Sequence, residues 1–91
     1  MNKPTYDEIA KSCDEFVVKY RRESEPRVID MRELEESLSE HGKTVEFHIK
    51  WLMANYEDEL EFIALAKWTD EGLIYLAKEN GKEELTKEEK R

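Results

Sequence analysis

The sequence predicts a small, mainly α-helical domain of four to five helices. Three observations favour this fold class. Apolar residues recur at spacings of three and four along residues 6–22, which is the period of an amphipathic helix. Helix-capping signals precede several of the segments that follow. The 91-residue chain also has only three glycines and two prolines, which disfavours a turn-rich β-sandwich.

The first expected element is a helix over residues 6–22. Its apolar stripe consists of Tyr6, Ile9, Ala10, Cys13, Phe16, Val17 and Tyr20. Thr5 precedes the stripe and Glu8 follows three residues later, so the two residues match the pattern of a capping box. Basic residues gather near the other end of the segment, where cations complement the helix dipole.

A second, shorter helix is expected after a connector at residues 23–26. Residues 27–29 are compatible with a very short strand before it. Asp30 can cap this helix, because Glu33 follows it three residues later. The pair His41-Gly42 marks the C-terminal end of the helix.

Residues 44–53 fit two structures. As a helix, the segment places Val45 and Ile49 on one face, and residues 57–68 form another helix because they are rich in Glu, Leu, Ala and Lys. As a strand, the segment alternates apolar and polar residues and pairs with residues 60–68. The turn between them lacks the Asn-Gly or Asp-Gly of a tight hairpin. We therefore expect helices, and the alternative is an α+β fold with an antiparallel hairpin at 44–53/60–68.

The last expected element is a helix that begins after Thr69. Thr69 is a candidate N-cap, acidic residues fill the first turn, and Trp68 with Leu73 matches a hydrophobic staple. The pair Asn80-Gly81 is a stop signal. Residues 1–81 are thus expected to form one domain, and the charged residues 82–91 a disordered tail.

The charge of the chain is strongly acidic and unevenly spread. The formal net charge is −8. Residues 30–40 carry a net charge of −4 and residues 57–71 carry −5, whereas residues 15–27 and 41–54 each carry +1. This distribution disfavours an ordinary basic nucleic-acid binder and favours a partner with a basic surface.

Several classes of protein and site are not expected. No segment approaches the apolar length of a membrane span, and the start of the chain lacks the apolar core of a signal peptide. Cys13 is the single cysteine, which fits a cytoplasmic protein. We find no metal-ligand spacing, cofactor motif or catalytic motif, and therefore expect no metal, no cofactor and no enzymatic activity.

Two sets of residues are candidates for binding a partner. The acidic candidates are Glu33, Glu36, Glu40, Glu57, Asp58, Glu59 and Glu61. The aromatic candidates are Phe47 and Trp51, because a helix over residues 44–53 is apolar on all sides and leaves one side outside a single small core. Exposed aromatic residues there would anchor a partner or a second copy in a homodimer.

Residues 31–52 resemble the helix-turn-helix of winged-helix regulators. The positions that match the apolar framework of this family are Leu34, Leu38, Thr44, Val45, His48, Ile49 and Leu52. The chain departs from the family pattern at Glu35, where the family has a small residue, at Ser39, which replaces the turn glycine, and at Glu40, which replaces an apolar residue.

The resemblance implies a DNA-binding regulator, commonly a dimer. The residues that would contact phosphates in this alternative are Lys43, Thr44, Lys50, Arg21, Arg22 and Arg27. The leading expectation is a different one. It is a small acidic, non-enzymatic regulatory or interaction protein, of the adaptor or inhibitor type, that binds a partner protein through acidic and aromatic surface.

Overall fold

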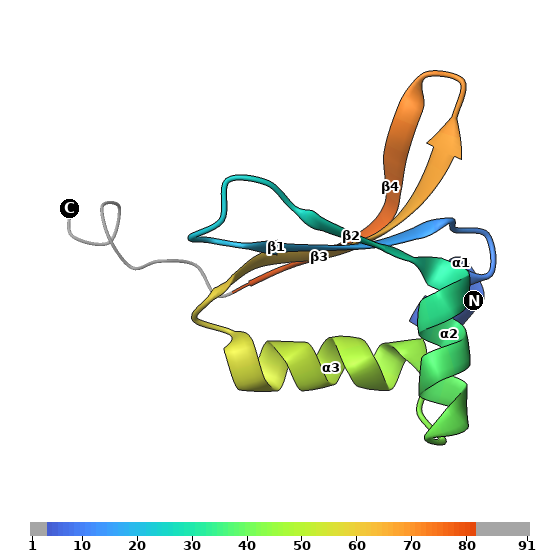
Figure 1. Ribbon diagram of the computed structural model, residues 1–91, viewed down its shortest axis with the longest axis horizontal. Coiled ribbons are helices and arrows are strands. Elements are labelled where there is room, and N and C mark those ends of the chain that lie inside the picture. Colours follow the sequence, from blue (N-terminus) through green and yellow to red (C-terminus); the bar gives the residue numbers. More distant parts are fainter. Residues whose placement is uncertain (1–3, 82–91) are drawn as a thin grey trace.

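The computed structural model describes residues 4–81 and shows, within them, three helices packed on one face of a four-stranded antiparallel sheet (Figure 1). The helices are α1 (Tyr6–Ala10), α2 (Met31–Glu40) and α3 (Val45–Tyr56). The strands are β1 (Glu15–Tyr20), β2 (Arg27–Asp30), β3 (Leu60–Thr69) and β4 (Gly72–Asn80). Their order in the sheet is β2-β1-β3-β4, so that β1 and β3 are central and the other two are edges.

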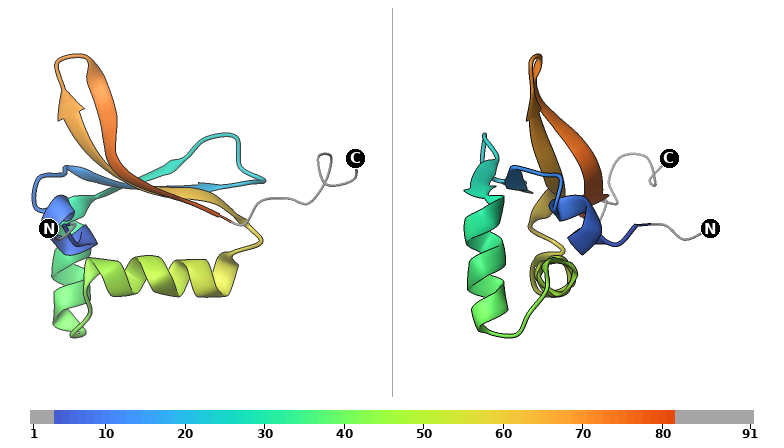
Figure 2. Two further views of the ribbon diagram at one scale, coloured as in Figure 1. Left: turned by 180° about the vertical axis from the view of Figure 1, so that it is seen from behind. Right: turned by 90° about the vertical axis from the view of Figure 1, so that its right-hand side faces the viewer.

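The sheet register sets which side chains share a face. Phe16 lies opposite Ile29 on one side and Leu65 on the other. Directly opposed residues of neighbouring strands point to the same face of a sheet. Register shifts occur in two places, at the end of β1 and between Leu65 and Ala66 of β3. The β3–β4 hairpin rises from the sheet on the side away from α3 (Figures 1 and 2).

The main core lies between the sheet and the helices. Its buried members are Ala10, Phe16, Val18, Met31, Val45, Ile49, Leu52, Leu60, Ile63 and Leu65. A smaller buried cluster lies on the other face of the sheet and consists of Val17, Ala64 and Ala66. The central strands are therefore buried on both faces, although only one face carries helices.

The N-terminal end of α3 is capped by two side chains. The Thr44 hydroxyl accepts a hydrogen bond from the Phe47 amide at 3.0 Å. The Asp7 carboxylate of α1 accepts from the Val45 amide at 2.8 Å and the Glu46 amide at 3.2 Å. Figure 2 shows α1 beside this end of α3. The first amides of a helix have no partner within the helix, so these bonds tie α3 to α1.

The expected mainly α fold is wrong, and the α+β alternative fits. The helix that was expected over residues 6–22 ends at Ala10, and residues 15–20 form β1. Phe16, Val17 and Val18 are all buried, so β1 shows no alternation of apolar and polar residues. A strand that is covered on both faces lacks the alternation of apolar and polar residues by which a half-buried strand is identified. The spacing of its apolar residues matched the pattern of an amphipathic helix instead.

The helices expected over residues 57–68 and after Thr69 are also wrong. These segments form β3 and β4, which pair with each other around a tight turn. The Thr69 hydroxyl donates to the Gly72 carbonyl at 2.8 Å and thus closes the turn rather than capping a helix. Gly72 has a φ of +117°, which favours glycine. The hairpin therefore joins β3 to β4. Residues 45–53, the expected partner strand, lie in α3 instead.

The expected helix ends and the short strand are confirmed. Thr5 and Glu8 form a capping box at α1, and Asp30 caps α2 by accepting from the Glu33 amide at 3.0 Å. Gly42, with a φ of +67°, follows the end of α2. Residues 27–29 lie in β2. Within residues 4–81, none of the helices is long and apolar enough to cross a membrane. The tail expected over residues 82–91 lies outside the described residues.

Candidate interaction surface

Three of the acidic candidates lie together on α2. Glu33, Glu36 and Glu40 are exposed and follow one another at spacings of three and four, which places them on one face of the helix. The opposite face carries Met31, which is buried in the core. Within residues 4–81, none of these three carboxylates takes part in an ion pair. Their negative charge is therefore directed at solvent.

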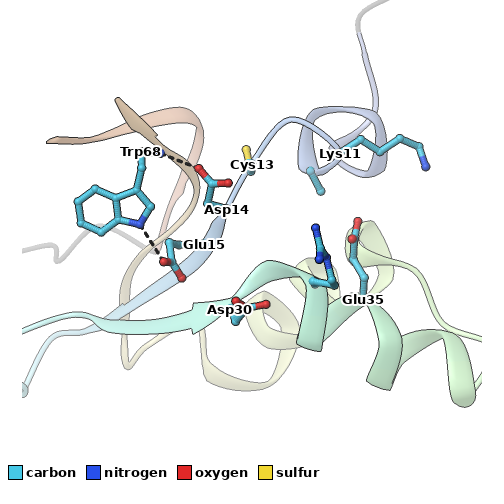
Figure 3. A pocket seen from close by; sticks show the side chains of 9 residues that line it. Lys11, Cys13, Asp14, Glu15, Asp30, Glu35 and Trp68 are labelled. Atoms are coloured by element: carbon cyan, nitrogen blue, oxygen red, sulfur yellow. Dashed lines mark hydrogen bonds between the residues drawn. The ribbon is translucent and has the colours of Figure 1, made fainter. Parts of the chain in front are cut away.

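A pocket of about 470 Å³ lies beside this helix (Figure 3). It is lined by Ala10, Lys11, Cys13, Asp14, Glu15, Asp30, Arg32, Glu35 and Trp68. Four carboxylates and two cations give this lining a formal charge of −2. Residues from α1, β1, β2, α2 and β3 come together here, so only the folded chain forms the pocket.

Trp68 forms an aromatic wall of the pocket. Its backbone amide donates to Asp14 Oδ2 at 2.8 Å, and its indole Nε1 donates to Glu15 Oε2 at 2.8 Å. Figure 3 shows both bonds reaching from Trp68 of β3 to Glu15 at the start of β1 and to Asp14 just before it. The indole is held in place while 54% of the residue stays exposed. An indole beside carboxylates offers a cation both a π face and negative oxygens.

Cys13 also lines this pocket, and its own thiol is protonated. Burial raises the pKa of the Cys13 thiol, and the neighbouring Asp14 carboxylate raises it further. The Lys67 ammonium acts in the opposite direction but does not overcome these effects. Only the thiolate is a strong nucleophile. The Cys13 side chain therefore forms part of the pocket wall. Cys13 follows α1 and does not lie on the apolar stripe of the expected long helix.

The second acidic group lies at the other end of α3. Glu57, Asp58 and Glu59 occupy the turn between α3 and β3, and Glu61 is on β3. Glu61 Oε1 accepts from Lys19 Nζ at 2.9 Å, and this bond lowers the pKa of the Glu61 carboxyl.

Basic residues surround this second group. The Arg21 amide donates to the Glu59 carbonyl at 2.8 Å. A cavity of about 220 Å³ there is lined by Tyr20, Arg22, Glu23, Arg27, Tyr56 and Glu59. The acids of this turn therefore lie against the basic stretch of the β1–β2 connection, and part of their charge is balanced within the chain.

The aromatic candidates lie on the exposed side of α3. Phe47 and Trp51 are each 44% exposed and are separated by one helical turn. Lys43 Nζ lies 4.5 Å from the centre of the Phe47 ring. The Trp51 indole stacks on His48, with ring centres 6.3 Å apart and planes 5° from parallel. Neighbouring side chains thus hold both rings in defined positions.

The residues of the DNA-binding alternative fall into two separate groups. Lys43 and Thr44 lie at the N-terminal end of α3, and Lys50 lies halfway along it. The Tyr20–Tyr56 contact places the β1–β2 connection, with Arg21 and Arg22, and the start of β2, with Arg27, at the C-terminal end. A 12-residue helix spans roughly 18 Å, so the two groups are far apart. Figure 1 shows this separation along α3.

Several of these residues are also engaged within the chain. The Thr44 hydroxyl caps α3. Lys50 Nζ lies 3.2 Å from Glu46 Oε2. Arg27 Nε donates to Glu23 Oε1 at 3.0 Å, and its guanidinium lies over the Tyr20 ring.

The pocket was not predicted from the sequence. Asp14 and Glu15 were expected inside a helix, and Trp68 was expected in a staple. The pairing of β1 with β3 brings them together, and no local pattern encodes that pairing. Within the described chain, no group of three or more His, Cys, Asp or Glu side chains is placed to hold a metal ion.

Comparison of this chain with protein-family models, with curated proteins and with solved structures found no match.

Proposed function

We propose that this protein is a non-enzymatic interaction protein, of the adaptor or inhibitor type, that binds a partner protein with a basic surface. The observation that carries the proposal is the concentration of negative charge on one side of the molecule. Glu33, Glu36 and Glu40 of α2 face solvent, and the adjoining pocket has a lining charge of −2. We propose the cytoplasm as its compartment, since the single cysteine is compatible with reducing conditions.

The pocket supports a specific mode of contact. A lysine or arginine side chain from the partner would enter beside Trp68 and meet the carboxylates of Asp14 and Glu35. Charge-assisted hydrogen bonds to carboxylates are stronger than neutral ones, and an indole face adds a cation–π contact. The exposed carboxylates of α2 would steer the approach of the basic surface.

Phe47 and Trp51 supply the apolar part of the proposed surface. Aromatic residues on a protein surface commonly carry much of the binding energy of an interface. Both rings are held by neighbours and therefore lose little conformational freedom on binding. In this proposal the acids at Glu57, Asp58, Glu59 and Glu61 contribute mainly to long-range attraction, because basic residues lie next to them.

The experiment compares two neutralised variants that have the same net charge. One variant carries Glu33→Gln, Glu36→Gln and Glu40→Gln. The matched control carries Glu57→Gln, Asp58→Asn and Glu59→Gln. The probe is a fluorescently labelled peptide of alternating lysine and arginine, and its binding is measured by anisotropy. Three lost ion pairs at about 0.5 kcal/mol each predict about tenfold weaker binding for the α2 variant.

The control variant distinguishes local from overall charge. We expect its affinity to fall by less than about threefold, because it changes the net charge without changing the proposed contact surface. Equal losses in the two variants would show that only net charge matters and would contradict the proposed site. Circular dichroism of both variants checks that the fold is retained.

A DNA-binding regulator is the second candidate function. The observation that favours it is the succession of α2 and α3, joined by residues 41–44, within the segment that resembles a helix-turn-helix. The test is an electrophoretic mobility shift at low salt with a pool of random duplexes. A shift that is lost in the Lys43→Ala, Lys50→Ala variant would support this function. No shift with any duplex would remove it.

A further inference from the structure

Asp14, in the pocket beside α2, is held in place by hydrogen bonds on three sides. Its amide donates to the Ala66 carbonyl at 2.8 Å, and its carbonyl accepts from the Met31 amide at 3.0 Å. Its carboxylate accepts from the Trp68 amide. Asp14 and Trp68 therefore keep one arrangement relative to each other before a partner binds, which lowers the cost of ordering them on binding.

The carboxylates of the pocket have oxygens left for further donors. Within residues 4–81, Asp14, Glu15 and Asp30 each accept a hydrogen bond on only one of their two carboxylate oxygens. Within the same residues, the Glu35 carboxylate forms neither a hydrogen bond nor an ion pair. An ionised carboxylate can accept several hydrogen bonds. The pocket can therefore receive donors that point in different directions.

Trp68 adds a flat aromatic surface to these acceptors. Its indole nitrogen donates to Glu15, which orients the ring, and Figure 3 shows the indole beside Asp14 and Glu15. In the described part of the chain, no other aromatic ring and no cation lies against the Trp68 ring. The ring is therefore available to a cation from outside the chain.

We propose that this pocket receives an arginine side chain of the partner and selects arginine over lysine. The inference rests on the proposed function, because a partner with a basic surface must supply the side chain. A guanidinium is planar and carries five N–H donors in a fixed fork, so it can stack on Trp68 and donate to a neighbouring carboxylate at the same time. The ammonium group of lysine is a compact point charge without a flat face to stack.

The charge and the size of the pocket also favour a guanidinium. The lining has a formal charge of −2, so one bound cation leaves it at −1. Entry into the pocket removes water from the cation, and a guanidinium is more weakly hydrated than an ammonium. The volume of about 470 Å³ gives the larger, flat group room to contact several walls.

The acids of the α2 face do not share this selectivity. Glu33, Glu36 and Glu40 are exposed on the helix and do not line the pocket. They attract a basic surface through charge, which lysine and arginine have in common. A preference for arginine therefore reports on the pocket, whereas affinity common to both cations reports on the acidic face.

The test uses the two tryptophans of the chain as separate probes. Trp51→Phe leaves Trp68 as the only indole. Trp68→Leu leaves Trp51, which lies on α3 outside the pocket, as the matched control. The ligands are hexa-arginine and hexa-lysine peptides with blocked ends, which have equal length and charge. Indole emission reports on the environment of the ring, and the anisotropy of labelled peptides gives the affinities.

In the Trp51→Phe protein, we expect hexa-arginine to change the Trp68 emission and to bind about five to ten times more tightly than hexa-lysine. In the Trp68→Leu protein, the Trp51 emission should change equally with both peptides, and their affinities should agree within about twofold. The variant with Glu33→Gln, Glu36→Gln and Glu40→Gln should bind both peptides more weakly but keep the preference for arginine. Circular dichroism checks the fold, and the emission of Trp68 in the Trp51→Phe protein does not depend on the stability of Trp68→Leu.

Two results would overturn the arginine site and leave the acidic face of α2 in place. One is equal affinity of the Trp51→Phe protein for the two peptides. The other is a Trp68 emission that stays unchanged when hexa-arginine is bound. Absence of binding of either peptide to wild type would instead contradict the proposed function, and the arginine site with it.

Discussion

His48 packs its imidazole against Phe16, with ring centres 5.7 Å apart. Burial lowers the pKa of His48 below its usual value near 6.5. As the pH falls, His48 is therefore protonated at a higher pH in the unfolded chain than in the folded chain. The folded state loses stability as the pH falls below about 6.5 toward the lowered pKa. Above that range, both states hold a neutral imidazole and the loss disappears.

The corresponding prediction concerns the pH dependence of unfolding. His48→Gln should flatten the fall in the free energy of unfolding between about pH 7 and pH 5.5. His41→Gln is the matched control and should leave the fall in place, because His48 is still present. Urea denaturation at both pH values gives the measurement. An unchanged slope in His48→Gln would contradict the assignment to this residue.

Gly81 follows β4 where the backbone passes very close to β3. A Cβ atom at this position would lie 2.0 Å from the Leu60 carbonyl oxygen and 2.8 Å from the Leu60 carbonyl carbon. Because both atoms belong to the backbone, they cannot rotate away as a flexible side chain would. Gly81→Ala is expected to lower the free energy of unfolding by about 1–3 kcal/mol. Asn80→Ala, at an exposed neighbouring position, should change it by less than about 0.5 kcal/mol; similar losses in both would refute the steric argument.

The junction of α1 and α3 is the clearest prediction at the scale of elements. Asp7 accepts two amides at the start of α3, where a carboxylate also complements the helix dipole. Asp7→Ala should cost about 1–2 kcal/mol of unfolding free energy, and Asp7→Asn should cost less because an amide oxygen still accepts. Chemical denaturation of the two variants measures the difference. Equal stability of wild type and Asp7→Ala would show that the cap is not stabilising.

The sequence allowed two of the helix caps to be predicted, because capping is a local interaction. Thr5 and Asp30 each accept an amide three residues ahead, and α1 and α2 begin after them as expected. Thr44 caps α3 in the same way, although this cap was not predicted. Thr69 offered the same local pattern but lies in a turn between strands. The glycine at position 72 could have indicated that turn, because glycine is common at turn positions that require a positive φ. Gly72 has a positive φ in the structure.

The central strands could not be predicted, because their signal is not local. Ile63–Ala66 are four consecutive buried residues, which periodicity alone does not assign to strand or helix. Tertiary pairing with β1 decided the outcome against the helix propensity of Leu and Ala. The acidic residues of the candidate surface were visible in the sequence, whereas the pocket beside them depends on that same pairing.

At the scale of the whole molecule, the net charge of −8 is arranged unequally around the fold. The acids of the α3–β3 turn lie beside arginines and Lys19, whereas those of α2 face solvent beside a negative pocket. Reversal of Glu57 and Glu59 to lysine should therefore slow association with a basic peptide but alter its dissociation rate little. Stopped-flow kinetics separate the two rates, and a change confined to dissociation would contradict a steering role for this turn.

The most direct test of the proposed function is the affinity for the labelled lysine–arginine peptide as a function of salt concentration. Screening weakens exposed charge pairs beyond about 10 Å at 0.1 M salt. We predict that the dissociation constant of wild type rises steeply with salt. For the variant with Glu33→Gln, Glu36→Gln and Glu40→Gln we predict a much shallower rise. The same slope for both proteins, or no slope for wild type, would contradict binding through the acidic face of α2.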